Sequence, residues 1–199
     1  MASKLRDNHA LTLRDYLRLA TASSHDLLDA SMRPAADWRS AEDYARFLGV
    51  QYAARVSVEH WLSRHAPAEL RPPEQTPLIV RDLVQMGKAI ETPHIAFELA
   101  PKGKASMIGI AWVLAGSSLG NRAMLHDMRR ALSKGDEWPN EFLSSTAMIE
   151  FWKALRARVE VPVVQEIAVE ATEAATRVFE HFLRTAPSYT SGSALERSF

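Results

Sequence analysis

One histidine and one arginine near the N-terminus have the spacing of a pair that could bind a cofactor. If residues 13–28 form a helix, Leu17 and Leu28 lie within about 60° of Leu13 and define an apolar stripe. His25 lies about 120° from Leu13, at the edge of this stripe, and Arg18 lies two turns earlier on nearly the same meridian, about 10 Å away. A neutral imidazole at the lip of an apolar pocket can be an axial haem ligand, and a nearby cation can bind a propionate. Histidines at a helix edge are often ordinary core or surface residues, so the spacing alone leaves both interpretations open.

A second segment places three glycines on one side of a predicted helix. Gly109, Gly116 and Gly120 lie within about 20° of one meridian. Each glycine inside a helix costs about 1 kcal/mol relative to alanine, so the stripe indicates that something bulky or flat approaches the backbone closely. The stretch from Gly116 to Gly120 also contains two serines, a composition that allows a kink. The alternative is close packing of another helix against a ridge of small residues.

The composition excludes several other classes of site. The chain has 199 residues and no cysteine, which rules out disulfides, thiolate zinc sites, iron–sulfur clusters and thiolate-ligated haem. Its 24 lysines and arginines balance its 24 aspartates and glutamates, so a nucleic-acid partner is not expected. The one Glu-x-x-His spacing, from Glu91 to His94, is broken by Pro93, so a di-iron site is not expected either.

No segment is predicted to enter a membrane. The longest apolar-leaning run, from Met107 to Leu119, has thirteen residues and is too short to span a bilayer. The N-terminal sequence MASKLRDNHALTLRDYL lacks the apolar stretch of a secretory signal. These features predict a cytoplasmic protein without a membrane partner.

Helical spacing between polar or proline-rich breaks predicts an all-α fold. Glycine is scarce, at 8 of 199 residues, and no Asn-Gly or Asp-Gly hairpin signal occurs. We expect helices at about residues 11–30, 40–65, 76–90, 104–132, 138–159 and 162–185. They would form one domain over residues 11–185, after an N-terminal arm of residues 1–10 and before a flexible tail of residues 186–199.

Two segments resemble one family, the haem oxygenases. Residues 17–29, LRLATASSHDLLD, resemble the proximal helix of these enzymes, and residues 112–122, WVLAGSSLGNR, resemble the distal helix of their bacterial branch. That branch includes enzymes that supply biliverdin to bacteriophytochromes. The resemblance covers roughly residues 11–185 and implies a single-domain helical bundle with haem held between the proximal and distal helices.

The resemblance also implies roles for residues of the first helix. His25 would be the axial ligand of the haem iron, and Arg18 would match the basic position near the propionates. Thr21 belongs to the same haem-binding motif. Arg156 matches a second basic position more loosely.

On the distal helix, Gly116 and Gly120 would bring the backbone over the haem, and Ser117 would face the pocket. Three residues depart from the usual bacterial pattern: Ala115 stands where a glutamate is common, Asn121 replaces the second glycine of a Gly-Gly pair, and Trp112 stands where a tyrosine is common. These departures bear on turnover more than on the fold or on haem binding.

The implied reaction is the oxidative opening of haem to biliverdin, CO and ferrous iron. It would use O₂ and electrons from an external reductase or ferredoxin, and a bacteriophytochrome could accept the biliverdin. No histidine occurs between His94 and His126, so the glycine-striped part of the distal helix carries none. The alternative is a non-catalytic haem-binding or haem-sensing protein of the same fold.

Overall fold

The structure, a computed structural model, describes residues 11–36, 38, 40–90, 95–100, 103–132 and 137–192. The helices in this part of the chain are α1 (Leu13–Ala36), α2 (Ala41–His65), a 3₁₀ turn (Ala68–Leu70), α3 (Thr76–Gln85), α4 (Lys104–Ser117), α5 (Asn121–Ala131), α6 (Glu141–Ser144), α7 (Ala147–Val159) and α8 (Gln165–Gly192). The described residues contain no strand beyond an isolated bridge between Thr12 and Pro162, so the prediction of an all-α fold is confirmed. None of these helices combines the length and apolarity needed to cross a membrane.

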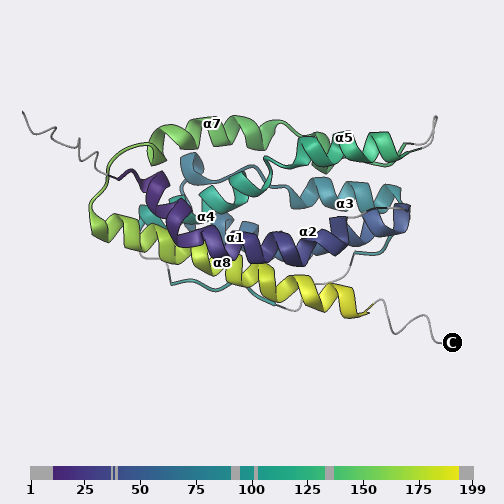
Figure 1. The fold of residues 1–199 in the computed structure, drawn as a ribbon, viewed down its shortest axis with the longest axis horizontal. Helices are drawn as coiled ribbons and strands as arrows, with labels where there is room; N and C mark the ends of the chain where they lie inside the picture. The colour runs from purple at the N-terminus through teal and green to yellow at the C-terminus, as the bar shows by residue number, and fades with distance from the viewer. Residues whose placement is uncertain are drawn as a thin grey trace, which may run out of the picture.

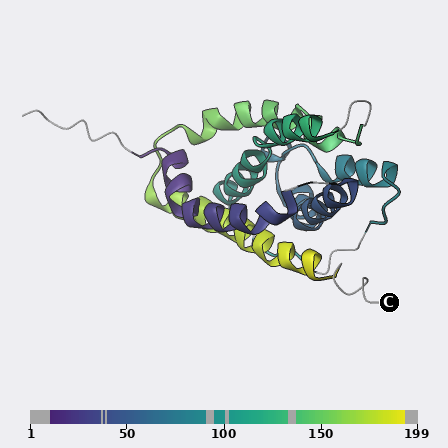
Figure 2. The same ribbon diagram turned by 45° about the vertical axis from the view of Figure 1, so that its right-hand side comes forward.

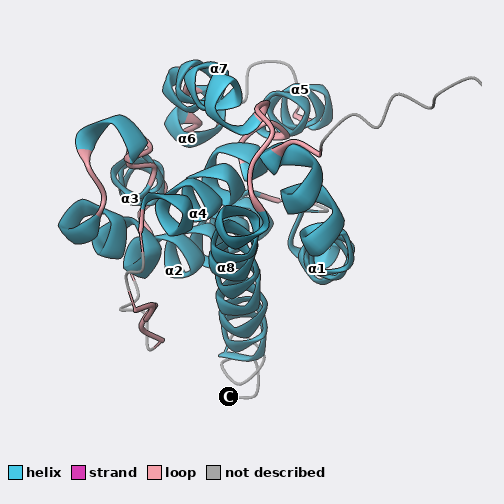
Figure 3. Cartoon of the chain, turned by 90° about the vertical axis from the view of Figure 1, so that its left-hand side faces the viewer, coloured by secondary structure: helices cyan, strands magenta, loops and turns pink. Residues whose placement is uncertain are grey.

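The long helix α8 is the main support of the fold. It packs along both α4 and α1, and it also contacts α2. Figure 1 shows α8 along one side of the molecule and α7 and α5 along the opposite side. The turned view in Figure 2 shows α4, in teal, between these two sides. Seen from the end, α8 lies between α1 and α2 (Figure 3).

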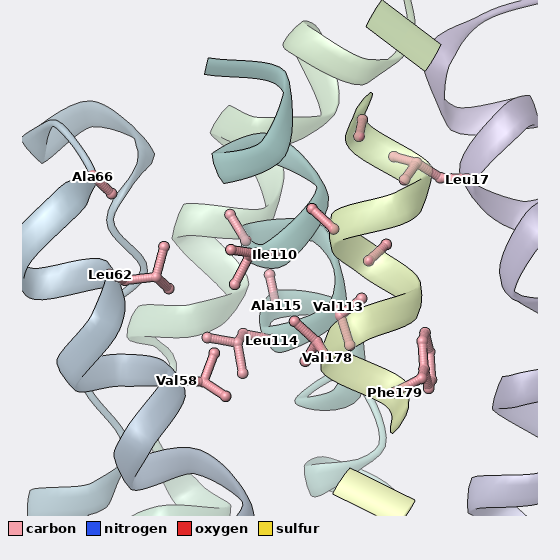
Figure 4. Close-up of a cluster of buried hydrophobic side chains, with 14 of the residues drawn as sticks. Leu17, Val58, Leu62, Ala66, Ile110, Val113, Leu114, Ala115, Val178 and Phe179 are labelled. Carbon is pink, nitrogen blue, oxygen red and sulfur yellow. The ribbon is translucent and has the colours of Figure 1, made fainter. Parts of the chain in front are cut away.

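Two apolar clusters form the core. The larger joins α1, α2, α4, α7 and α8, and Figure 4 shows Val58 and Leu62 of α2 near Ile110 and Leu114 of α4. The smaller joins α2, α3, α5 and α6; its most buried members include Tyr44, Phe47, Ile79 and Phe142. Because α2 contributes to both clusters, its middle is fixed relative to α4 on one side and to α6 on the other.

The start of α1 is held by local and distant hydrogen bonds. The backbone N–H and hydroxyl of Thr12 donate to the Asp15 carboxylate at 3.0 and 2.6 Å, and the Asp15 N–H donates back to the Thr12 hydroxyl at 3.2 Å. These bonds keep the pKa of Asp15 below its ordinary value. The N–H of Leu13 donates to the Val161 carbonyl at 3.0 Å, which ties the first turn of α1 to the segment between α7 and α8.

Gly109 lets α4 and α8 approach backbone to backbone. A Cβ atom at this position would overlap the Ala171 carbonyl oxygen and would lie 2.9 Å from its carbonyl carbon. At Gly109 the structure therefore supports helix–helix packing, the alternative explanation of the glycine stripe.

Some helix boundaries differ from the sequence prediction. The segment predicted as one helix over 104–132 is divided into α4 and α5 by a turn at residues 118–120. The segment predicted as one helix over 138–159 is also two helices, the short α6 and then α7. Helix α3 ends at Gln85 rather than near residue 90, and Gly87 follows with φ of +68°, a conformation that favours glycine. Helix α8 continues to Gly192, beyond the predicted end at 185. The predicted arm at 1–10 and residues 193–199 of the predicted tail lie outside the described residues.

Candidate functional site

A cavity of about 1230 Å³ lies beside α1. Its walls come from α1, the middle of α2, the end of α4 with the turn into α5, one aromatic residue of α7 and two of α8. The volume exceeds the roughly 300–1,000 Å³ of ordinary small-molecule sites, and most of the lining residues are apolar. The predicted site residues that line it are Arg18, Thr21, His25, Gly116, Ser117 and Gly120.

The His25 imidazole is held by a carboxylate one turn later on α1. Its Nδ1 lies 3.2 Å from Oδ2 of Asp29, and its ring packs edge-on against Phe179 of α8 at a centroid distance of 6.2 Å. A histidine that ligates a metal commonly donates its second ring N–H to a carboxylate, which fixes the tautomer and the ring orientation. With Nδ1 engaged by Asp29, Nε2 is the nitrogen left for a ligand.

Three arginines lie near the α1 wall of the cavity, and they differ in what they contact. Arg18 lines the cavity, is exposed, and makes no ion pair with any residue that the structure describes. Arg14 also lines it but donates to Oε1 of Glu160 at 3.1 Å. Arg156 donates to the same oxygen at 2.7 and 2.9 Å and does not line the cavity. Arg18 is thus the arginine of this group available to an anionic ligand.

The two lining hydroxyl groups are already bonded within their own helices. Thr21 is buried and donates to the Leu17 carbonyl at 2.7 Å, and Ser117 donates to the Leu114 carbonyl at 2.9 Å. Neither hydroxyl proton is therefore offered to a ligand while these bonds are in place.

Gly116 and Gly120 differ from Gly109 in their surroundings. A Cβ at Gly116 would lie 3.8 Å from Trp152, and one at Gly120 would lie 3.5 Å from the Met124 side chain, both ordinary contacts. Among the residues that the structure describes, no packed group requires glycine at these two cavity-lining positions.

The departures from the bacterial motif lie in different places. Ala115 is fully buried in the larger apolar cluster and does not line the cavity. Asn121 does line it, and its Nδ2 donates to the Phe142 carbonyl at 3.4 Å. The changes at Asn121 and at Trp112, which also lines the cavity, therefore alter its wall directly, and the change at Ala115 does not.

The charged groups of the cavity are concentrated on α1. The lining acids Asp15, Asp26 and Asp29 all belong to this helix, as does His25. The opposite lining from α2 and the α4–α5 turn carries the neutral polar groups of Gln51, Ser117 and Asn121. In the described part of the chain, no three histidine or acidic side chains gather closely enough to hold a metal ion; Glu91–His94 lies outside it.

A functional candidate that the sequence analysis missed is Arg55 on α2. Its side chain is 1% exposed, its Nη2 donates to Oγ of Ser117 at 2.9 Å, and its Nε donates to Oε1 of Gln51 at 3.1 Å. Its Nη1 is buried without a protein partner. Burial lowers the pKa of the guanidinium, and the charge of Glu59 opposes this shift. The signal was present in the sequence, since Arg55 lies two turns from both Leu48 and Leu62 and so falls on an apolar stripe.

The comparisons with known proteins support the fold. No protein-family model matches the chain, and no curated protein matches its sequence. Among solved structures, it is similar to a heme oxygenase from Neisseria meningitidis crystallised with NO and CO bound. The two share 21% sequence identity and superimpose with a TM-score of 0.63, over 90% of this chain and 92% of the other. The chain therefore has the fold of that enzyme.

Proposed function

We propose that the chain binds haem in this cavity and opens it oxidatively to biliverdin, CO and ferrous iron. The observation that carries the proposal is the arrangement of one cavity: a carboxylate-held histidine on α1 shares it with two glycines whose small size no protein contact requires. On a fold like that of a haem oxygenase, the histidine would ligate the iron of a porphyrin, and the glycines would let the backbone pack closely against the porphyrin ring.

The residues present fit haem chemically. An imidazole is a common axial ligand of haem iron, and Asp29 would orient it. Arg18 would bind a propionate through a charge-assisted hydrogen bond. The apolar lining would hold the macrocycle, and Gly116 and Gly120 would let the backbone approach it.

When bound, haem would supply the iron and oxygen chemistry together with the carbon that is attacked. The chain would orient the macrocycle and exclude water from it. The acids and the histidine of the described lining are on α1, so the α4–α5 wall has no carboxylate or imidazole to act as a proton donor. We propose O₂ and an external reductase or ferredoxin as the sources of oxidant and electrons, and a bacteriophytochrome as the biliverdin acceptor.

A second candidate function is haem binding or sensing without turnover. The observation that favours it is Asn121, which puts an amide side chain into the wall where the bacterial motif has glycine. The change at Ala115 does not favour it, because that residue is in the core.

Hemin titration of the purified protein and of His25→Ala tests the proposal. The parent should give a saturable Soret shift and the spectrum of an imidazole-ligated haem. The variant should lose that spectrum, and added imidazole should restore part of it. His60→Ala, which removes an exposed histidine of α2 away from the cavity, is the matched control and should behave as the parent. If His25→Ala keeps the parent spectrum, His25 is not the ligand.

Turnover is tested with hemin-loaded protein, catalase, and ascorbate or a ferredoxin–reductase pair. Loss of the Soret band with growth of biliverdin absorbance and release of CO supports the oxygenase function. Stable haem under the same conditions, without biliverdin or CO, supports the binding or sensing function instead.

A further inference from the structure

Arg55 is a buried cation without a carboxylate partner. No ion pair joins it to any residue in the described part of the chain. The acid on the next turn of α2, Glu59, is engaged elsewhere: its oxygens accept from the N–H groups of Gln75 and Thr76 at 2.9 and 3.1 Å and from the Thr76 hydroxyl at 2.6 Å. Glu59 therefore caps α3. Removing a guanidinium from water without a direct counter-ion is costly, so stability alone does not explain Arg55.

The chemistry of the guanidinium fixes the direction of each of its hydrogen bonds. Arginine has only donors, so the atom of Gln51 that faces Arg55 must be its oxygen, and Ser117 must accept. The Ser117 hydroxyl donates its proton to the Leu114 carbonyl, and its oxygen accepts from Arg55, so both hydrogen-bonding functions of this side chain are in use. With its oxygen engaged, Gln51 is left with its Nε2 amide donors for other groups, and Gln51 lines the cavity.

Two further features place positive potential behind this wall. The guanidinium carbon of Arg55 lies 5.5 Å from the Phe142 ring centroid, and the guanidinium is shielded from solvent. Its charge is therefore screened less than that of a surface arginine. The unpartnered Nη1 adds donor capacity that no described protein group uses.

We propose that Arg55 is a positioning residue that makes the α2–α4 wall of the cavity a recognition site for small hydrogen-bond acceptors, such as a halide or a diatomic gas bound to haem. It holds Gln51 with its amide donors free, engages the Ser117 oxygen in a hydrogen bond of its own, and supplies positive potential from behind both. This inference rests on the proposed function, because the haem would bring the small ligand to the wall.

The test compares Arg55→Met with Arg64→Met after loading with ferric haem. Arg64 is exposed on the same helix and does not line the cavity, so its variant controls for loss of an arginine. Fluoride is the probe, because it only accepts hydrogen bonds. We expect fluoride to bind about tenfold more weakly to Arg55→Met than to the parent, with the ferrous CO stretching frequency raised, and hemin affinity and the Soret band unchanged. Arg64→Met should match the parent in all of these.

The melting temperature separates this role from a structural one. Exchanging an unpaired buried cation for an apolar side chain of similar length should leave stability equal or raised. Unchanged fluoride affinity and CO stretch in Arg55→Met, with a lowered melting temperature, would show that Arg55 only packs against Phe142, and the proposal would be wrong. If the parent binds no hemin, it is the proposed function that fails.

Two more variants keep the test decisive. Gln51→Leu made in the parent should weaken fluoride binding nearly as much as Arg55→Met does. Made in the Arg55→Met variant, it should weaken binding little further, because Arg55 acts through Gln51. Additive losses would overturn that part of the proposal. If Arg55→Met does not fold, Arg55→Lys takes its place in the test. Lysine keeps the positive charge but lacks the planar guanidinium that binds two partners at once, so fluoride should bind several-fold more weakly than to the parent. Fluoride binding equal to that of the parent would refute the role of Arg55.

Discussion

Alanine at Gly109 and at Gly116 should change stability in opposite directions, although both glycines belong to α4 and lie on one stripe. Helix propensity favours alanine over glycine by about 1 kcal/mol inside a helix. At Gly116 the nearest atom to a new Cβ is 3.8 Å away, so this gain is not offset. The melting temperature of the haem-free protein should therefore rise by about 2–4 °C for each kcal/mol gained.

At Gly109 the same methyl group would overlap the backbone of Ala171, which cannot rotate away as a side chain could. Helices α4 and α8 would have to separate, which would loosen their long shared interface. Overpacking of this kind costs about 1–3 kcal/mol, and a backbone obstacle favours the upper end. After the gain in helix propensity, the net loss for Gly109→Ala should be about 2 kcal/mol.

Urea denaturation of the two variants and the parent, without haem, measures these differences directly, and hemin titration follows on the same samples. Gly116→Ala should be the more stable protein and the weaker hemin binder, because its methyl group enters the cavity wall. If both variants are stabilised equally, α4 and α8 are not in close contact in solution. If Gly116→Ala binds hemin as the parent does, the ligand does not require glycine there.

Two other changes have definite expected outcomes. Arg18→Glu should weaken hemin binding about tenfold or more by titration while Arg64→Glu does not, and equal affinities would show that Arg18 is simply solvated. His181 is buried between Phe97 and Phe182, and this burial lowers its pKa to about 4, with Arg184 adding to the shift. The His181 ring takes up a proton near pH 6.5 in the unfolded state but only near pH 4 in the folded state. The free energy of unfolding is therefore highest above pH 6.5, and it decreases as the pH falls from 6.5 toward 4, by about 3 kcal/mol at most. Urea denaturation across this range should show a shallower decline for His181→Phe, and a parallel decline would contradict the assignment.

The sequence predicted the long helices better than the breaks between them. Helical spacing between two breaks in the sequence located α2, and the Ser40 hydroxyl, which accepts from the Asp43 N–H, caps its start. The start of α6 depends instead on Asp82, whose carboxylate accepts from the N–H groups of Glu141 and Phe142 at 2.8 and 3.0 Å. A cap supplied from some sixty residues away has no local signal.

The site was predictable where one helix carries several of its residues. The period of α1 placed His25 and Arg18 on one side of the helix and the family resemblance added Thr21; all three line the cavity, and their roles remain predictions. The engagement of Arg156 by Glu160 competes with its predicted role, and sequence reasoning about single positions does not weigh such pairs. Arg55 was missed because its importance comes from contact with Ser117, a residue 62 positions later that reaches it only through the packing of α2 on α4.

The charged side chains differ between the two walls of the cavity, so the electric field across the cavity has a defined direction. On α1, Oδ2 of Asp29 lies 3.2 Å from Nδ1 of His25, and a carboxylate in this place would orient the ring. Behind the other wall, Arg55 holds a positive charge in a place where solvent screens it poorly. A group bound between them would receive electron density from the α1 side and meet hydrogen-bond donors on the other. Such a field favours a ligand that gains negative charge on the α2–α4 side. An arginine set behind neutral polar side chains can supply this field without bringing an acidic proton to the ligand, because the guanidinium remains protonated.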